Sequence, residues 1–200
     1  MATVEKAQKQ ALLEPKPYQW SRGEYYKLGE LGLFNEKRVE LIEGEVIEMS
    51  PIYSPHMTSV TLAIDALRDA FGKGWVLRVQ GPLSLGINSD PEPDLAVVAG
   101  KARDFKDSHP TTAALVIEVA DSTLAYDRNV KASLYAKSGI ADYWIVNLKK
   151  RQVEVHRRPI IDVTAKYGYS YADKMIFTEQ DSVAPLAKPK TKIAVADLLP

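Results

Sequence analysis

Apolar residues recur along this chain with two different periods, and the two periods predict where helices and strands lie. One helical period begins at Ser54, which is followed by proline and suits a helix start with serine as the cap. Glycines at positions 72 and 74 end this helix. A second helix is predicted over residues 126–137. A short helix starts at Ser21, because Glu24 follows it at the spacing of a capping box.

Short alternating or continuously apolar runs predict the strands. Residues 38–49 alternate in two pieces around Glu43 and Gly44, which suits a hairpin. Further strands are predicted at residues 75–79, 83–87, 94–98, 114–120, 141–148 and 152–157, and in the tyrosine-rich part after residue 167. This order of elements predicts a mixed α/β (α+β) fold with a central mixed β-sheet flanked by helices.

Composition limits the number of domains, the kinds of binding site and the cellular locations that are possible. With 200 residues and 46% apolar content, the chain can bury one core, so we expect a flexible N-terminal arm at residues 1–19 and a single domain at 20–200. Lys plus Arg and Asp plus Glu number 26 each, so binding of a polyanion must rest on local patches. Cysteine is absent, which excludes disulfides and thiolate chemistry. No apolar run suggests a membrane span or a signal segment, and we expect a cytoplasmic protein.

Two acids interrupt the apolar strands. Asp94 stands in Glu-Pro-Asp-Leu-Ala-Val-Val and Glu118 in Ala-Leu-Val-Ile-Glu-Val-Ala. An ionised carboxylate in a buried strand is costly unless a metal ion or a nearby cation compensates its charge. Magnesium takes such hard oxygen ligands, and Lys131 lies near the apolar stripe of the second helix, where its ammonium group can turn inward. The alternatives are a structural ion pair for Glu118, a turn cap for Asp94 and a solvated charge for Lys131.

Several short motifs together carry a family resemblance. They are Glu40-Leu-Ile-Glu-Gly-Glu45, Ser50-Pro51 with His56, Pro91-Glu-Pro-Asp94-Leu, Ile117-Glu118-Val with Ser122, Asp127 to Lys131, Tyr135-Ala, and Gly139-Ile-Ala-Asp-Tyr-Trp144. In combination they resemble the Uma-two-type family of restriction-endonuclease-like proteins, within the PD-(D/E)XK nuclease superfamily. The resemblance covers residues 20–200 and implies a restriction-endonuclease-like sheet that carries a magnesium-dependent nuclease site, in which manganese can substitute.

The resemblance also implies roles for individual residues. Asp94 matches the signature aspartate and Glu118 the second acid, and both would hold the metal. The superfamily lysine normally follows the second acid by two residues, where this chain has Ala120, so Lys131 on the helix would replace it. A further glutamate often completes such sites, and the candidates are Glu40 and Glu45, which alternation puts on opposite faces. Glu40 is favoured because its neighbours in the strand point the other way while Ile42 shares its half-buried face. A solvated strand acid is the alternative for each.

Four more residues are candidates for binding the substrate. His56 lies in the first turn of a helix, where backbone donors favour an anion, and Gln80 follows a central strand. Arg78 and Arg128 are candidates for phosphate contacts. A surface cap for His56, a satisfied strand residue for Gln80 and ordinary surface charges for the arginines are the alternatives.

These residues predict an endonuclease that hydrolyses phosphodiester bonds of nucleic acid, with DNA as the expected substrate. Lys131 would position or deprotonate the attacking water. A homodimer is expected, because many nucleases of this kind cut two strands as pairs of subunits. A catalytically silent nucleic-acid-binding or protein-interaction module on the same fold is the alternative. A glycoside hydrolase also uses two carboxylates, but the three tryptophans do not cluster near the acids in the sequence.

Overall fold

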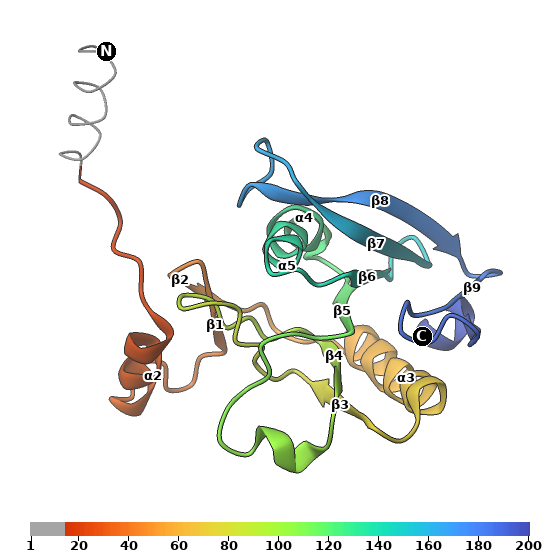
Figure 1. Cartoon of the computed structure of the whole chain (residues 1–200), viewed down its shortest axis with the longest axis horizontal. Coiled ribbons are helices and arrows are strands. Elements are labelled where there is room, and N and C mark those ends of the chain that lie inside the picture. The colour runs from red at the N-terminus through yellow and green to blue at the C-terminus, as the bar shows by residue number, and fades with distance from the viewer. Residues whose placement is uncertain (1–14) are drawn as a thin grey trace.

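The computed structural model describes residues 15–200, and a twisted sheet with helices on both faces forms its centre (Figure 1). The six strands follow in the order β3-β4-β5-β6-β7-β8. Their bounds are Trp75–Val79, Leu95–Ala99, Leu115–Ala120, Asp142–Asn147, Gln152–Ile161 and Tyr169–Thr178. All neighbouring pairs are antiparallel except β5 and β6, which run parallel. The predicted mixed α/β fold with a central mixed sheet is confirmed.

Two hydrophobic cores occupy the two faces of this sheet. The long helix α3 (Ser54–Phe71) and the short 3-10 helix η3 (Val195–Leu198) cover one face, and α5 (Ala132–Lys137) covers the other. Strand β5 is buried along its whole length because it lies between both cores. The odd residues of β5 contact the first core and Val116 and Ala120 contact the second, so Glu118 faces the second core, as the alternation predicted.

Smaller elements surround the sheet. The helix α2 (Arg22–Glu30) starts at the predicted capping box, in which Ser21 and Glu24 bond each other's backbone. The predicted hairpin is formed by β1 (Val39–Ile42) and β2 (Glu45–Glu48). Its turn needs Gly44, because φ there is +81° and an added Cβ would lie 2.6 Å from the Cβ of Gln19. The remaining elements are η1 (Ala102–Phe105), β9 (Ser182–Val183) and β10 (Ile193–Ala194).

The predicted strand at residues 83–87 is wrong. Leu83 and Leu85 are buried, so the apolar pattern indicated burial, but this segment pairs with no single neighbour. Its amides donate instead to three separate carbonyls, those of Pro91, Pro110 and Ser89. The segment is therefore a loop that is buried at residues 83–85, because its hydrogen bonds are satisfied one residue at a time and not as a ladder.

The predicted start of the long helix needs a smaller correction. Ser54 is the first helical residue and not the cap, which is Tyr53 without a side-chain capping bond. Pro55 occupies the first turn as expected, and Gly72 ends the helix.

The second predicted helix spans residues 124–137 and is interrupted by a turn of another type. It consists of α4 (Leu124–Tyr126), the π-helical turn η2 (Asp127–Lys131) and α5. A π-turn inserts one extra residue into a helix and is frequent at functional sites. Periodicity predicted the extent of the helix from residue 126 to 137 but not this turn.

Most of the predicted arm at residues 1–19 lies outside the described residues, and the division into an arm and one domain stays a prediction. The described residues 15–19 are exposed, and the amide of Trp20 then donates to Gly44 of the hairpin. Within residues 15–200, no helix has both the length and the apolar surface that crossing a bilayer requires.

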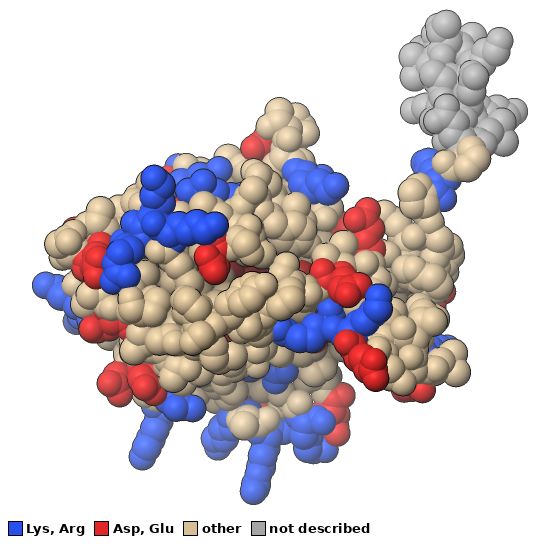
Figure 2. Space-filling view, turned by 180° about the vertical axis from the view of Figure 1, so that it is seen from behind, with Lys and Arg blue, Asp and Glu red and all other residues tan. Residues whose placement is uncertain are grey.

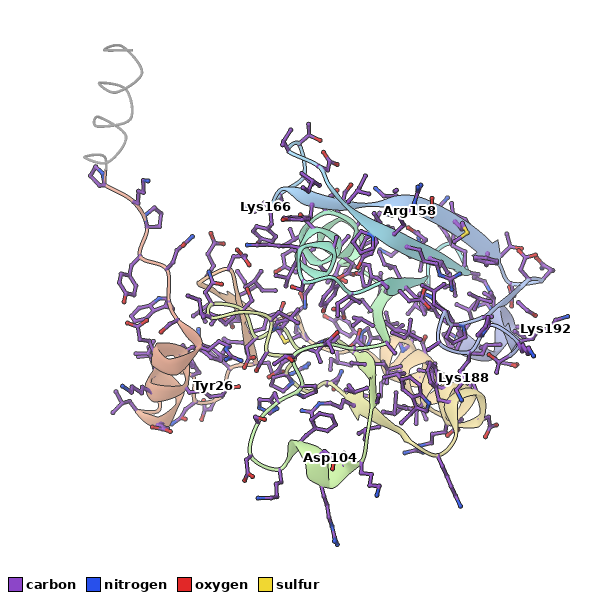
Figure 3. All side chains as sticks on the ribbon, in the orientation of Figure 1. Tyr26, Asp104, Arg158, Lys166, Lys188 and Lys192 are labelled. Carbon is purple, nitrogen blue, oxygen red and sulfur yellow. The ribbon has the colours of Figure 1, made fainter. Side chains whose placement is uncertain are left out.

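Charged side chains of both signs are interspersed over the face seen in Figure 2, although basic side chains project from its lower edge. The loop after β4 lies at that end, where Figure 3 labels Asp104, and it carries the exposed Lys101, Arg103 and Lys106. This face shows no extended field of one sign, so attraction of a polyanion needs local cations, in agreement with a formal net charge of zero.

His156 on β7 is expected to make stability depend on pH. Its ring packs against Tyr143 and Tyr171, and burial together with Lys174 lowers its pKa to about 4. A histidine whose pKa falls on folding stabilises the fold above its unfolded pKa of about 6.5, and this contribution is lost as the pH falls from there towards 4.

Replacing His156 with phenylalanine should remove that dependence. Between pH 7 and pH 5 the wild type should lose about 2 kcal/mol of unfolding free energy more than His156→Phe does. Urea denaturation at both pH values measures the difference. If the unfolding free energy of the two proteins changed equally between pH 7 and pH 5, His156 would not be the cause of the pH dependence.

Candidate active site

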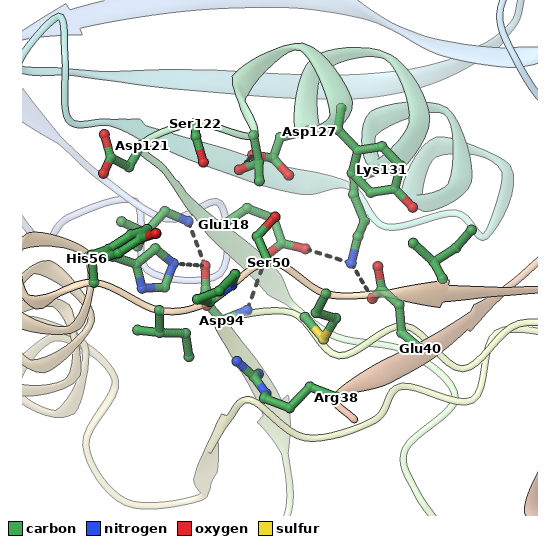
Figure 4. Close-up of a pocket in the computed structure, with 18 of the residues that line it drawn as sticks. Arg38, Glu40, Ser50, His56, Asp94, Glu118, Asp121, Ser122, Asp127 and Lys131 are labelled. Carbon is green, nitrogen blue, oxygen red and sulfur yellow. Dashed lines mark hydrogen bonds and ion pairs between the residues drawn. The ribbon is translucent and has the colours of Figure 1, made fainter. Parts of the chain in front are cut away.

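A cavity of about 380 Å³ opens where the β1–β2 hairpin, the start of α3, the strands β4 and β5 and the π-turn meet. Its charged lining includes Glu40 from β1, Asp94 immediately before β4, Glu118 from β5, and Asp127 and Lys131 from the π-turn. Figure 4 shows these side chains converging from segments far apart in the sequence. The structure therefore brings together all four residues that were predicted to be catalytic.

Lys131 forms a buried ion-pair network with two acids. Its Nζ lies 2.5 Å from Oε2 of Glu40 and 3.4 Å from Oε1 of Glu118. The side chains of Lys131, Glu40 and Glu118 are 4%, 2% and 7% exposed. The hydroxyl of Tyr135 donates to the same Oε1 of Glu118 at 2.7 Å. Water therefore has little access to this lysine, and its ammonium group is held in one place by its partners.

Asp94 is tied to Glu118 through the backbone of both strands. The register pairs Leu95 with Ile117, which puts the two acids side by side. The amide of Val119 donates to Oδ2 of Asp94 at 2.8 Å, and the amide of Asp94 donates to Oε2 of Glu118 at 3.1 Å. Both carboxyl groups therefore lie on the same side of the sheet and line one cavity.

Two of the predicted substrate-binding residues contact this pair of acids. Nε2 of His56 lies 3.0 Å from Oδ2 of Asp94, and His56 lines the cavity. Nε2 of Gln80 donates to Oδ1 of Asp94 at 3.3 Å. His56 is thus placed to reach a ligand in the cavity, whereas Gln80 orients the aspartate.

Burial and neighbouring acids raise the pKa values of Glu118 and Asp127. Burial raises the pKa of Glu118 to about 8, with Lys131 acting against it and Asp94 adding to it. Burial also raises the pKa of Asp127 to about 6, although the hydroxyl of Thr123 donates to it at 2.7 Å. Burial opposes the charge on Lys131, but Glu118 and Glu40 hold its pKa above the usual range. The lining therefore holds six acids against Lys131 and Arg38, which leaves the cavity favourable for a further cation.

The side chains present fit an open site for a small, hard cation. Asp94 and Glu118 offer carboxylate oxygens, and magnesium is commonly bound through only one or two carboxylates together with waters. Across residues 15–200, no three acidic or histidine side chains gather into a complete metal-binding group. Such a partial set of ligands agrees with a site that leaves coordination positions of the cation open for a phosphate.

The structure does not bring Arg78 or Arg128 to the cavity. Nη2 of Arg78 lies 3.0 Å from Nδ1 of His109, and Arg78 does not line the cavity. Arg128 belongs to the π-turn but forms two bonds of 2.7 Å with Glu154 of β7. Both arginines are already engaged elsewhere, so neither is part of the candidate site as described.

Arg128 allows a direct test of this placement. The Arg128→Gln variant should lose about 1 kcal/mol of stability, because Glu154 loses its bidentate partner but keeps Asn147 and Gln152 as donors. Any activity of the cavity should stay at the wild-type rate. Thermal unfolding and the cleavage assay described below measure both. A fall in rate with unchanged stability would put Arg128 back among the substrate contacts.

Sequence reasoning missed Asp127, Tyr135 and Arg38 as parts of the site. A signal existed for the first two, because Asp127, Lys131 and Tyr135 are spaced by four residues and so share one helical face. Arg38 lines the cavity next to Glu40, but its sequence context is that of any exposed charge. Figure 4 shows Arg38 and Asp127 on opposite sides of the cavity.

Comparisons with known proteins agree with this description. A crystal structure from Anabaena variabilis, described as that of a "putative nuclease belonging to DUF820", superposes with a TM-score of 0.60 at 15% sequence identity. The superposition covers 82% of this chain and 90% of the other, and it shows a shared fold. No curated protein matches the chain. The model of the Uma2 family, described as "Putative restriction endonuclease", matches residues 23–189. The resemblance seen in the motifs is confirmed, and the chain belongs to the Uma2 family.

Proposed function

We propose that this protein is a magnesium-dependent endonuclease that hydrolyses phosphodiester bonds of DNA. The observation that carries the proposal is the shared cavity in which Asp94 and Glu118, on adjacent strands, meet the buried pair of Lys131 and Glu40. The description of the Uma2 family supports a nuclease-like activity. Metal dependence and DNA as the substrate are our inference from the chemistry of the side chains.

In this proposal Asp94 and Glu118 hold the divalent ion, and manganese can replace magnesium. When bound, the ion supplies Lewis-acid polarisation of the phosphoryl oxygens. Lys131 stands beside Glu118, where its ammonium group orients the attacking water and offsets negative charge that develops on the phosphate. Glu40 is a positioning residue, because its carboxylate holds Lys131 by a 2.5 Å contact.

His56 completes the proposed site from the start of α3. Its Nε2 contacts Asp94, and its buried Nδ1 has no hydrogen-bond partner among residues 15–200. His56 lies in the first turn of α3 and lines the cavity, so its side chain is placed to contact a phosphate oxygen there. Gln80 acts indirectly, through its bond to Asp94.

Relaxation of a supercoiled plasmid tests the proposed function. We expect nicking with magnesium or manganese and none after EDTA is added. Fluorescence anisotropy with labelled duplex and single-stranded DNA, run in parallel, distinguishes an enzyme from a silent binding module. Binding without cleavage under any divalent ion would overturn the nuclease proposal and favour that module.

The proposal includes a homodimer in the cytoplasm, in which each subunit cuts one strand. Light scattering should then give twice the 22.2 kDa of one chain. A mass of one chain at the concentrations used for cleavage would contradict the dimer without affecting the proposed chemistry.

A further inference from the structure

A second hollow adjoins the active-site cavity on the side of α2. Its volume is about 330 Å³, near the lower end of the range of about 300–1,000 Å³ for ligand pockets. Arg38 lines both the first cavity and this hollow, so its side chain lies between the two. Figure 3 labels Tyr26 on α2, which forms one wall. We call this hollow the aromatic pocket.

Aromatic rings dominate the lining of the aromatic pocket. Tyr25 and Tyr26 come from α2 and Phe34 from the loop after it. The rings of Tyr25 and Phe34 have centroids 5.3 Å apart at an interplanar angle of 30°. Hydroxyl groups anchor both tyrosines, since Tyr25 donates to the carbonyl of Val39 at 2.9 Å and Tyr26 donates to Asp90. The ring surfaces are therefore held in place before any ligand arrives.

Cations flank these rings on the side of the catalytic cavity. Among residues 15–200, the guanidinium group of the exposed Arg38 has no hydrogen bond or ion pair, and Lys37 has only an exposed pair with Glu48. Exposed pairs of this kind contribute little and are easily exchanged for a phosphate. Glu92 lies in the wall of the pocket and offers an acceptor for an exocyclic amino group. Rings beside an unpaired guanidinium group and a weakly paired lysine form a combination that binds a base together with its phosphate.

Because of the acids in the catalytic cavity, a phosphate chain can bind there only with the help of nearby cations. A phosphate chain that approaches Asp94, Glu118 and Asp127 is repelled by them, and the net charge of the protein offers no compensating field. Arg38 lies between the two hollows, where its guanidinium group can offset this repulsion.

We propose that the aromatic pocket binds one unstacked nucleobase of a DNA strand whose adjacent phosphate lies at Arg38 and whose next phosphate enters the catalytic cavity. The proposal rests on the proposed nuclease function and adds a substrate class, namely single-stranded or locally unpaired DNA. A base within an intact duplex has both faces stacked and cannot reach these rings. Phe34 and Tyr25 supply the stacking surface, and Arg38 supplies the phosphate contact.

Two oligonucleotides of equal charge test this pocket. One is a fluorescein-labelled strand of ten deoxycytidines, and the other has ten abasic sites on the same backbone. Anisotropy should show at least about fivefold tighter binding of the first strand by the wild type. Phe34→Leu keeps an apolar side chain but removes the ring, so this ratio should fall towards one. Phe34→Trp should restore it.

Arg38→Gln should act differently, because it removes a phosphate contact and not a stacking surface. We expect weaker binding of both strands by the same factor, and a salt dependence whose slope falls by about one. Leu33→Ala, on the same exposed loop, and Arg68→Gln, on α3, are the matched controls and should bind like the wild type. Thermal unfolding of each variant accounts for any loss of folded protein.

The outcomes separate this inference from the proposed function. If the wild type nicks plasmid but Phe34→Leu leaves the binding ratio unchanged, the pocket is refuted and the nuclease stands. If base-dependent binding needs Phe34 but no divalent ion supports cleavage, the nuclease is refuted and the pocket stands. Failure of the folded wild type to bind either strand refutes the pocket.

Discussion

Asp94→Asn is expected to lower the rate of plasmid nicking by about 10²- to 10³-fold while the protein stays folded. Asparagine has the shape of aspartate and still accepts the hydrogen bond from the amide of Val119. Asparagine lacks the negative charge that binding of a divalent cation requires and on which the other groups of the cavity depend. Glu118→Gln should have an effect of the same size, because it removes the second carboxylate from the same cavity. Initial nicking rates in magnesium and in manganese measure both.

The control for these variants is Asp65→Asn. Asp65 lies on α3, is 74% exposed and pairs only with Arg68, so its loss should change neither the rate nor the stability measurably. Circular dichroism and thermal unfolding establish that each variant is folded. If Asp94→Asn, once shown to be folded, cleaves at the wild-type rate, the acids of this cavity are structural and the site lies elsewhere.

Lys131→Met is expected to cost about 3–5 kcal/mol of unfolding free energy at neutral pH, because it leaves Glu40 and Glu118 buried without their shared cation. The loss should be larger at pH 8 than at pH 6. Without Lys131 the pKa of Glu118 rises further above the value of about 8, and protonation at the lower pH relieves the uncompensated charge. Urea denaturation at both pH values measures this difference.

A second substitution shows whether uncompensated buried charge causes the loss of stability in Lys131→Met. Glu40→Gln in the Lys131→Met background should recover part of the lost stability, since glutamine removes one buried charge and still accepts the amide of Glu92. Lys137→Met is the matched control on the same helical segment. Its partner is Glu43 and its side chain is 40% exposed, so we expect a loss below about 1 kcal/mol. Equal losses for the two lysines would contradict a special role of burial at Lys131.

The residues that interrupt regular patterns were the ones that sequence reasoning could find. Asp94 and Glu118 stand out because a carboxylate in an apolar strand needs compensation, and the burial of both was foreseeable from neighbouring residues alone. The sequence did not decide whether the side chain of Lys131 points inward or into solvent. Only packing of the helix against the sheet turned it inward. Arg78 and Arg128 carry the same charge but have partners far away in the chain, His109 in a loop and Glu154 on β7, which no local pattern reveals.

The sequence by itself determined the α/β class, the capping box of α2, the hairpin turn and most strands, because each depends on residues that are neighbours in the chain. Tertiary structure decided the rest. The register of β4 on β5, the parallel pairing of β5 with β6 and the π-turn bring residues 38, 40, 94, 118, 127 and 131 around one cavity. It also made residues 83–87 a loop that is buried at 83–85 and placed Arg38 between the two hollows. These features depend on contacts between segments far apart in the chain, and the periodicity of any one segment contains no information about its distant partners.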